Sequence, residues 1–160
     1  MKKEEFLNKL LGDELISHLQ YAIASKVVEG ADYDACKAEF ETHSKEELDH
    51  FNKIMDLIIQ RGYKVDSDLK SLIDNAKSGY SKMNMVGSKE LVDFQHKAEV
   101  NAIKAYHEFL GYLEKETKKD YAAIKEIKSI LNDEIEHRTD LEKMFTSISS
   151  GKKIQSKFDY

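Results

Sequence analysis

The sequence predicts an all-α protein, namely a four-helix bundle in which a long crossover joins two antiparallel helix hairpins. Composition is the first reason: the 160 residues include no proline, no tryptophan and only seven glycines, while 34% are charged, as is typical of long amphipathic helices. Periodicity is the second reason, because apolar residues recur at helical spacing through four stretches of similar length. A chain of 18.5 kDa can bury one substantial core, so we expect a single domain.

Four amphipathic stretches define the long helices. They lie at about 3–28, 34–61, 88–115 and 119–147. Between the first two, Gly30 can end one helix and Asp32 can cap the next, which predicts a tight antiparallel hairpin. The polar run 115–119 separates the last two stretches and predicts a second hairpin.

The segment between the hairpins predicts a long crossover. Residues 61–87 contain three glycines and one short amphipathic piece, at 66–76, which we interpret as a small helix. Connections of this kind bring parallel helices side by side in a bundle. We therefore expect a bundle at residues 1–148 and a polar C-terminal tail at 149–160.

Charge and hydropathy exclude several classes of partner. The net charge of −5 offers no cationic surface to nucleic acid, so no nucleic-acid partner is expected. No apolar run approaches the roughly 18 residues of a membrane span, and the amino terminus lacks the apolar core of a signal peptide. Cys36 is the only cysteine, so an internal disulfide is impossible. We expect a cytoplasmic protein with no membrane partner.

One glutamate interrupts the apolar face of each predicted long helix. The four are Glu14, Glu47, Glu99 and Glu134. A buried carboxylate without a partner is costly, and no lysine or arginine lies on the same stripes to pair with them. A bound cation is therefore favoured over a buried network of salt bridges.

Two of these glutamates begin Glu-x-x-His motifs. Glu47 precedes His50 and Glu134 precedes His137 by three residues, a spacing that places both side chains on one face of a helix. Such pairs also arise by chance, so the motif needs support from its position in the fold.

The positions of the four glutamates supply that support. Residues at one level of an antiparallel hairpin are equally distant from its turn. Glu14 and Glu47 are centred on the first predicted turn, and Glu99 and Glu134 on the polar run 115–119. Each pair therefore faces across its own hairpin, and the two hairpins repeat the same pattern.

Four carboxylates and two imidazoles together suit two metal ions. Two divalent cations would neutralise the four carboxylates. Carboxylates with one imidazole per metal favour iron or manganese, and the lack of thiolates argues against structural zinc. Tyr21 and Tyr106 each follow the first glutamate of their hairpin by seven residues. Each is either a core aromatic whose hydroxyl bonds a ligand carboxylate or a redox participant.

At these residues the sequence resembles the bacterioferritins and the bacterioferritin-like miniferritins of the ferritin-like di-iron carboxylate superfamily. The segment 7–15, followed by Gln20 and Tyr21, is very similar to the ligand segment of that family's first helix. The resemblance covers all four helices and implies a ferritin-like four-helix bundle. It implies two iron ions per subunit and six ligands, a terminal pair for each iron and two bridges: Glu14 with His50, Glu99 with His137, and the bridging Glu47 and Glu134.

The resemblance also implies a function. Proteins of this kind oxidise Fe(II) with dioxygen or hydrogen peroxide and assemble into homo-oligomeric shells that hold a ferric mineral. We therefore expect a ferroxidase that serves iron storage or detoxification, with Tyr21 among its catalytic residues. Two alternatives stay open: a discrete di-iron or di-manganese peroxidase or catalase of rubrerythrin type, and a DNA-protecting miniferritin shell.

Three features depart from the family's pattern. Leu48 stands where the bacterioferritin haem ligand would be a methionine, so haem is not expected. The crossover is longer than in typical bacterioferritins and leaves the shell size open. The single cysteine cannot form the cysteine pair of some miniferritins.

Several other polar residues are assigned supporting roles. Asp133 and Glu46 each precede a bridging glutamate, and we expect Asp133 to hold the ring N–H of His50. Glu46 is either the equivalent partner of His137 or a solvated charge. His96 lies opposite His137 across the second hairpin and either braces that ligand, the role we favour, or binds metal itself.

A further histidine pair is predicted in the first hairpin. His18 and His43 are equally distant from the turn, so we expect them to face each other one turn from the ligands. They either form a transient metal site or simply bond each other and nearby backbone.

Overall fold

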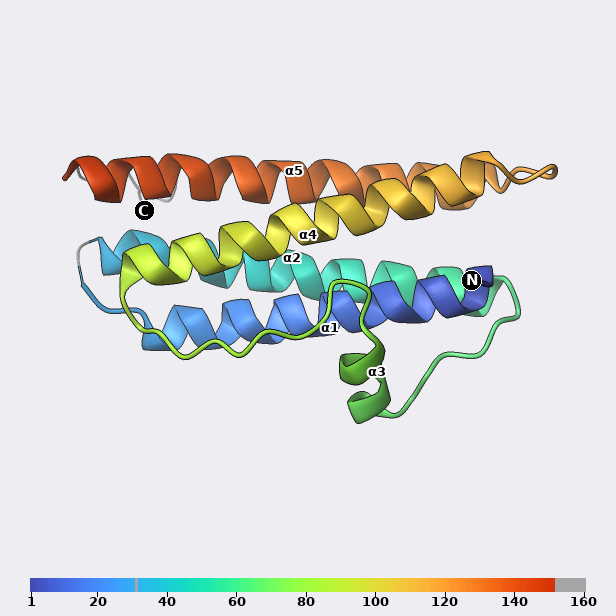
Figure 1. Ribbon diagram of the computed structural model, residues 1–160, viewed down its shortest axis with the longest axis horizontal. Coiled ribbons are helices and arrows are strands. Elements are labelled where there is room, and N and C mark those ends of the chain that lie inside the picture. Colours follow the sequence, from blue (N-terminus) through green and yellow to red (C-terminus); the bar gives the residue numbers. More distant parts are fainter. Residues whose placement is uncertain (31, 152–160) are drawn as a thin grey trace.

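The computed structural model describes residues 1–30 and 32–151. Within these residues the chain forms five helices: α1 (Lys3–Val27), α2 (Tyr33–Gln60), α3 (Leu69–Asn75), α4 (Ser88–Glu114) and α5 (Tyr121–Ser150). The antiparallel pair α1–α2 packs against the antiparallel pair α4–α5 (Figure 1). The predicted all-α four-helix bundle with a crossover helix is confirmed.

The two hairpin turns are made by different means. Gly30 and Asp32 adopt positive φ angles of 101° and 57°, and the Asp32 carbonyl accepts a hydrogen bond from the Cys36 N–H at 3.0 Å. Asp32 therefore begins α2 through its backbone rather than through a side-chain cap. In the second hairpin, Asp120 caps α5 by accepting from the Ala123 N–H at 3.0 Å.

Asp120 also ties the second turn to the end of α2. The Arg61 guanidinium donates to both Asp120 oxygens, at 2.5 and 2.7 Å. This two-point contact is the geometry in which arginine binds carboxylates best. It fixes the end of the first hairpin against the start of α5.

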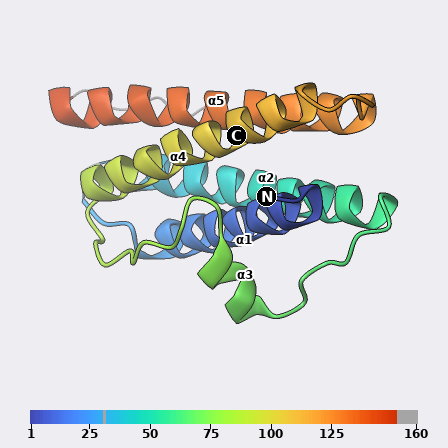
Figure 2. The ribbon, with the colours of Figure 1, turned by 45° about the vertical axis from the view of Figure 1, so that its right-hand side comes forward.

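The crossover runs back along α1 with α3 packed on the outside of that helix (Figure 2). Leu72 of α3 is 3% exposed, and its carbonyl approaches Gly12 so closely that a β-carbon there would overlap it. Glycine at position 12 is therefore required by packing. Leu69 stays 63% exposed, so the apolar strip of the crossover is only partly covered within one chain.

The crossover ends by pairing with the end of α1. The Glu29 N–H donates to the Val86 carbonyl at 2.8 Å, and the Ser88 N–H donates to the Glu29 carbonyl at 2.9 Å. These bonds place the start of α4 beside the end of α1, so α4 runs antiparallel to α1 and parallel to α2 (Figure 1).

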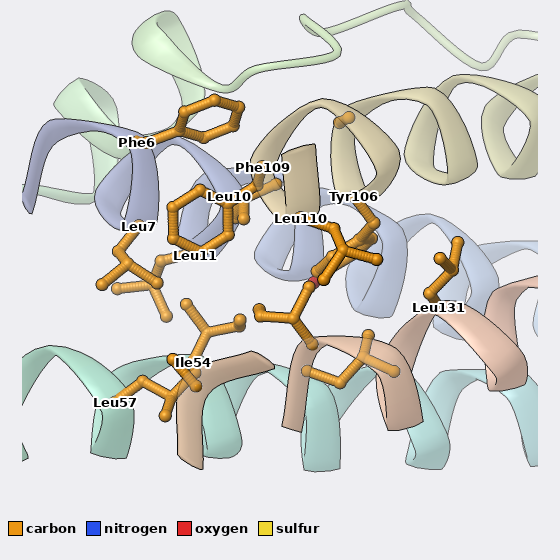
Figure 3. Packing of buried hydrophobic residues seen from close by; sticks show 14 of the residues in the cluster. Phe6, Leu7, Leu10, Leu11, Ile54, Leu57, Tyr106, Phe109, Leu110 and Leu131 are labelled. Atoms are coloured by element: carbon orange, nitrogen blue, oxygen red, sulfur yellow. The ribbon is translucent and has the colours of Figure 1, made fainter. Parts of the chain in front are cut away.

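Two apolar clusters fill the bundle, one on each side of a polar centre. All four long helices contribute to the larger cluster (Figure 3): Phe6, Leu7, Leu10, Leu11, Ile54, Leu57, Tyr106, Phe109, Leu110 and Leu131 among others. The smaller cluster, at the Gly30 end, includes Tyr21, Phe40, Val92, Leu141 and Met144. Burial of these side chains stabilises the bundle and excludes water from the centre.

The described helices bear on two further predictions. None of them has the length and apolarity that a membrane crossing requires. Helix α5 continues to Ser150, and the rest of the expected tail, residues 152–160, lies outside the described residues.

Candidate metal centre

The structure brings the six predicted ligands together between the two apolar clusters. Each is 1–3% exposed: Glu14, Glu47, His50, Glu99, Glu134 and His137. They form two overlapping groups whose ligand atoms all lie within 4.8 Å of one another: Glu14, Glu47, His50 and Glu134 in one, and Glu47, Glu99, Glu134 and His137 in the other. Glu47 and Glu134 belong to both groups, and this sharing is the arrangement that two bridged metal ions need.

One group is built around His50. Its Nδ1 lies 3.0 Å from Glu134 Oε1, 3.3 Å from Glu47 Oε2 and 3.5 Å from Glu14 Oε2. The carboxylates come from both hairpins, because Glu134 is on α5 while the other two are on α1 and α2. Packing of the two hairpins therefore creates this group.

The other group is built around His137. Its Nδ1 lies 3.2 Å from Glu47 Oε1, 3.6 Å from Glu99 Oε1 and 3.8 Å from Glu134 Oε2. Glu47 and Glu134 thus present one oxygen to each histidine. The two groups are related as the sequence repeat predicts.

Both imidazoles are held from outside by a carboxylate. His50 Nε2 lies 3.1 Å from Asp133 Oδ2, and His137 Nε2 lies 2.8 Å from Glu46 Oε2. The predicted partnership of Asp133 with His50 is confirmed, and Glu46 takes the equivalent role. A carboxylate at Nε2 favours a proton there, so Nδ1 is the nitrogen that faces the centre and could bind a metal ion.

The two tyrosines bond terminal carboxylates of the opposite hairpin. The Tyr21 hydroxyl donates to Glu99, and the Tyr106 hydroxyl donates to Glu14. Burial, followed by the nearby carboxylate charge, raises the pKa of both phenols, so each hydroxyl stays protonated as a donor. This geometry favours the carboxylate-bonding role for Tyr21 and Tyr106.

The terminal and bridging carboxylates differ in acidity. Burial raises the pKa of Glu14 and of Glu99, and the charges of neighbouring glutamates raise it further. Burial also disfavours ionised Glu47 and Glu134, but hydrogen bonds from the two histidines outweigh it and lower both pKa values. The bridging positions are therefore the ones that keep negative charge without a cation.

The histidines show the complementary effect. Burial alone would lower the pKa of His50 and His137, yet hydrogen bonds to the surrounding carboxylates outweigh it and raise both. Each imidazole thus holds a proton that a metal ion would have to displace.

The donor set fits a pair of metal ions. Several buried atoms lie within ion-pair distance of one another but make no well-aligned hydrogen bond: Glu14 Oε2, Glu47 Oε1, both Glu134 carboxylate oxygens and His137 Nδ1. Buried polar atoms are rarely left unpaired, and these belong to the two ligand groups. One imidazole nitrogen and several oxygens per position suit iron or manganese. Buried Glu and His clusters of this chain could therefore hold metal.

The expected bracing of His137 by His96 is wrong. His96 Nε2 lies 3.1 Å from Glu142 Oε1, and its side chain is 30% exposed. Gln95 is the residue that α4 buries at this level, with 1% of its surface exposed. Counting from the turn gives the level of a residue but not the rotation of its helix, which decides between adjacent positions.

His18 and His43 have separate partners instead of forming the expected pair. His18 Nδ1 lies 2.7 Å from the Ser44 carbonyl oxygen. The His43 ring stacks on His137, with 4.1 Å between ring centroids, and belongs to two groups that could hold a metal ion. His43 therefore faces the opposite hairpin.

Sequence reasoning missed two acidic residues beside His43. Glu39 and Asp140 form a group with it in which all ligand atoms lie within 4.8 Å of one another. The signal was present, since Glu39 lies four residues before His43 and Asp140 three after His137. Both residues continue the polar interruption of the inward stripes by one turn.

The fold and the buried Glu/His centre define a ferritin-like protein. Residues 4–150 match the family described as "Ferritin: Ferritin-like domain". Because this match covers most of the chain, the protein belongs to the ferritin-like family. No sequence match to a curated protein was found.

Solved structures agree with the family. The chain is similar to a dodecameric thioferritin, the bacterioferritin-related protein from Bacteroides fragilis, with 31% identity and a TM-score of 0.86 over 92% of this chain and 86% of that chain. A Dps variant from Listeria innocua has 13% identity and a TM-score of 0.83 over 96% and 98% of the two chains. Dps from Staphylococcus aureus has 10% identity and a TM-score of 0.81 over 89% and 93%. The two Dps likenesses show the fold alone.

Proposed function

We propose that the protein stores or detoxifies iron by oxidising Fe(II) to Fe(III), with dioxygen or hydrogen peroxide, at an intrasubunit di-iron centre. Glu14 and His50 would bind one iron, and Glu99 and His137 the other. The observation that carries this proposal is the sharing of Glu47 and Glu134 between the two ligand groups. Shared carboxylates hold two ions close enough to act on one oxidant.

Two irons at one place match the electron count of either oxidant. Two Fe(II) ions give two electrons, which with two protons reduce hydrogen peroxide to two waters or dioxygen to hydrogen peroxide. The protein's part is to bind both ions together, keep water out and take up or release protons. The two apolar clusters on either side of the centre provide the exclusion.

Proton exchange keeps the buried charge constant during iron binding. With no cation, we expect two protonated histidines, two ionised bridging glutamates and two protonated terminal glutamates, a net charge of zero. Two divalent cations with four ionised glutamates and two neutral histidines also sum to zero. Two irons can therefore replace four protons without leaving net charge in the core.

We further propose that the oxidised iron is deposited inside a homo-oligomeric shell in the cytoplasm. The similarity to a dodecameric thioferritin supports a shell. Exposed apolar side chains on α1 and α3 support burial against other subunits, since Leu19, Ile23 and Leu69 are 44%, 52% and 63% exposed.

Iron loading combined with mass measurement tests the proposal. Aerobic addition of Fe(II) to the metal-free protein should give rapid oxidation of the first two irons per chain, then continued uptake far beyond two. Size exclusion with light scattering should give the mass of a closed oligomer. Uptake that stops near two irons per monomeric chain would instead indicate a discrete redox enzyme, and absence of rapid oxidation would overturn the proposal.

A further inference from the structure

A small acidic pocket lies on the surface next to the metal centre. It has a volume of about 120 Å³ and is lined by residues of α2 and α5, including His43 and His137. Five carboxylates surround these two imidazoles: Glu39, Glu46, Asp133, Glu136 and Asp140. No lysine or arginine is among the described residues that line the pocket. The pocket therefore presents a negative, cation-attracting surface that reaches the ligand His137.

Of the two histidines that line this pocket, His43 is the one that does not belong to the six candidate ligands. It is 1% exposed, and its Nε2 lies 3.2 Å from Glu39 Oε1. Its Nδ1 is buried and has no hydrogen-bond partner. Its ring stacks on His137 and makes a T-shaped contact with Tyr21 at 5.1 Å between centroids. A buried ring nitrogen without a hydrogen-bond partner is available to bind a cation.

His43 links the pocket to the centre. One group that could hold a metal ion consists of Glu39, His43 and Asp140, and another consists of His43, Glu99 and His137. The ligand atoms of each group lie within 4.8 Å of one another. We call Glu39, His43 and Asp140 the outer group. His43 also belongs to the second group, whose other two members, Glu99 and His137, are candidate ligands of the metal centre. A cation bound in the outer group could therefore pass toward the centre while it stays bound to His43.

We propose that Glu39, His43 and Asp140 bind a third divalent transition-metal ion, such as Fe(II), and exchange it with the metal centre past His43. Two carboxylates and one imidazole neutralise a divalent cation while leaving positions for water. The pocket has room for a few waters, since each occupies roughly 30 Å³ in the liquid. Binding is independent of the proposed function, whereas the exchange of iron rests on it.

The same geometry predicts weak and reversible binding. Glu39 and Asp140 side chains are 12% and 16% exposed, so both are partly solvated. Lys143 lies 3.2 Å from Asp140, but its side chain is 70% exposed and competes only weakly for the carboxylate. Three protein ligands at the surface bind less tightly than the buried centre, as a site of transfer requires.

Cobalt(II) is the probe for binding, because it stays divalent during the soak. The double variant Glu39→Gln, Asp140→Asn removes the charge of both carboxylates that would bind the third ion. The control Asp49→Asn, Glu142→Gln makes the same charge change at exposed positions on the same two helices. Crystals soaked in Co(II) and measured at the cobalt edge should show anomalous density between Glu39, His43 and Asp140 in the parent and control only.

Titration with Co(II) in solution measures the affinity of the same site. The weakest of three Co(II) sites per chain should lose at least about tenfold in affinity in the double variant, while the control retains it. Absence of cobalt between the three residues in parent crystals would overturn the proposal. Equal occupancy of that position in the double variant would overturn it as well.

The exchange step has its own test. His43→Leu should slow the loading of the centre by limiting Fe(II) about tenfold, while two irons per chain still bind at saturation under anaerobic conditions. Unchanged loading would overturn the exchange. If the proposed ferroxidase function were wrong instead, cobalt would still occupy the outer position, but Fe(II) bound at the centre would not be oxidised.

Discussion

The two halves of the candidate metal centre have the same types of candidate ligand but different surroundings. The His50 half consists of Glu14, His50 and the outer carboxylate Asp133. The His137 half consists of Glu99, His137 and the outer carboxylate Glu46. Within each half, one carboxylate and one imidazole face the shared bridges, and the second ring nitrogen is held from outside.

The surroundings differ at one pair of related positions. His43 and Ile130 each lie four residues before the bridging glutamate of their own helix. His43 stacks on His137 and lines the acidic pocket, whereas Ile130 is 0% exposed within the larger apolar cluster. The His137 half therefore has a polar connection to the surface, and the position related to His43 is apolar in the other half.

This difference separates two requirements of such a site. Holding two like cations requires matched ligands in both halves. Exchange of ions with the surface requires only one polar route, and a second one would admit water to the core. Under the proposed function, the repeated Glu and His residues would meet the first requirement, and the break in the repeat at His43 would meet the second.

The largest effect is expected at the bridges, because they serve both halves. Glu47→Gln should slow the oxidation of the first two irons by roughly 100-fold or more, since it weakens both metal positions at once. Glu14→Gln should weaken mainly the His50 half and leave one tight site per chain. Stopped-flow absorbance and anaerobic Fe(II) titration measure the two effects. Oxidation at the parental rate in Glu47→Gln would contradict the bridging role.

Low pH should weaken metal binding in both halves together. The pKa values of His50, His137, Glu14 and Glu99 are all raised, so metal ions must displace protons from these groups. The affinity for metal ions should therefore decrease as pH falls, because protons compete for the same atoms. Two protons per iron correspond to as much as about 100-fold in affinity per pH unit.

A pH-indicator measurement in weakly buffered solution checks the proton count. Anaerobic binding of two Fe(II) per chain should release up to four protons near neutral pH. Release of none would contradict the acidity differences between terminal and bridging carboxylates.

Removing the carboxylate that holds each histidine from outside should weaken metal binding in one half at a time. Asp133→Asn and Glu46→Gln remove the charge that orients His50 and His137 respectively, and each should lower the affinity of its own half by about tenfold. Asp49→Asn, on the exposed face of α2, is the control. Titration with Co(II) should show one weakened site per variant. Two weakened sites in either variant would show that the halves are coupled more strongly than their separate contacts indicate.

The sequence alone predicted the bundle and brought the six candidate ligands to one level. Hairpin symmetry was sufficient for this, because Glu14 and Glu47, for example, are equally distant from a short turn. Long-range contacts could not be predicted in this way. The pairing of Glu29 with Val86 and Ser88 joins distant segments with no local signal. The same holds for the contact of Gly12 with α3.

Helix rotation limited the prediction of the supporting residues. Asp133 and Glu46 were located because each is adjacent to a bridging glutamate, whose direction was already fixed. His96 was misplaced because Gln95, one position earlier, is the residue that α4 turns inward. His43 was placed at the correct level, but its contact with His137 depends on how the two hairpins pack.

The smallest effect is expected at the two tyrosines, and it also tests whether the halves differ chemically. Each hydroxyl donates one hydrogen bond to a terminal glutamate, and such a bond contributes about 1 kcal/mol, or roughly fivefold in affinity. If both bonds are structural, Tyr21→Phe and Tyr106→Phe should weaken Fe(II) binding about equally and slow oxidation only in proportion. Tyr21 differs from Tyr106 in lying beside His43 and His137 in T-shaped ring arrangements, at 5.1 and 6.4 Å between centroids. A redox role for Tyr21 would therefore make Tyr21→Phe much slower than Tyr106→Phe at equal iron occupancy. Rapid-freeze electron paramagnetic resonance during oxidation would then show a tyrosyl signal in the parent that only Tyr21→Phe abolishes. Equal rates and no such signal would leave both tyrosines as donors that position Glu14 and Glu99.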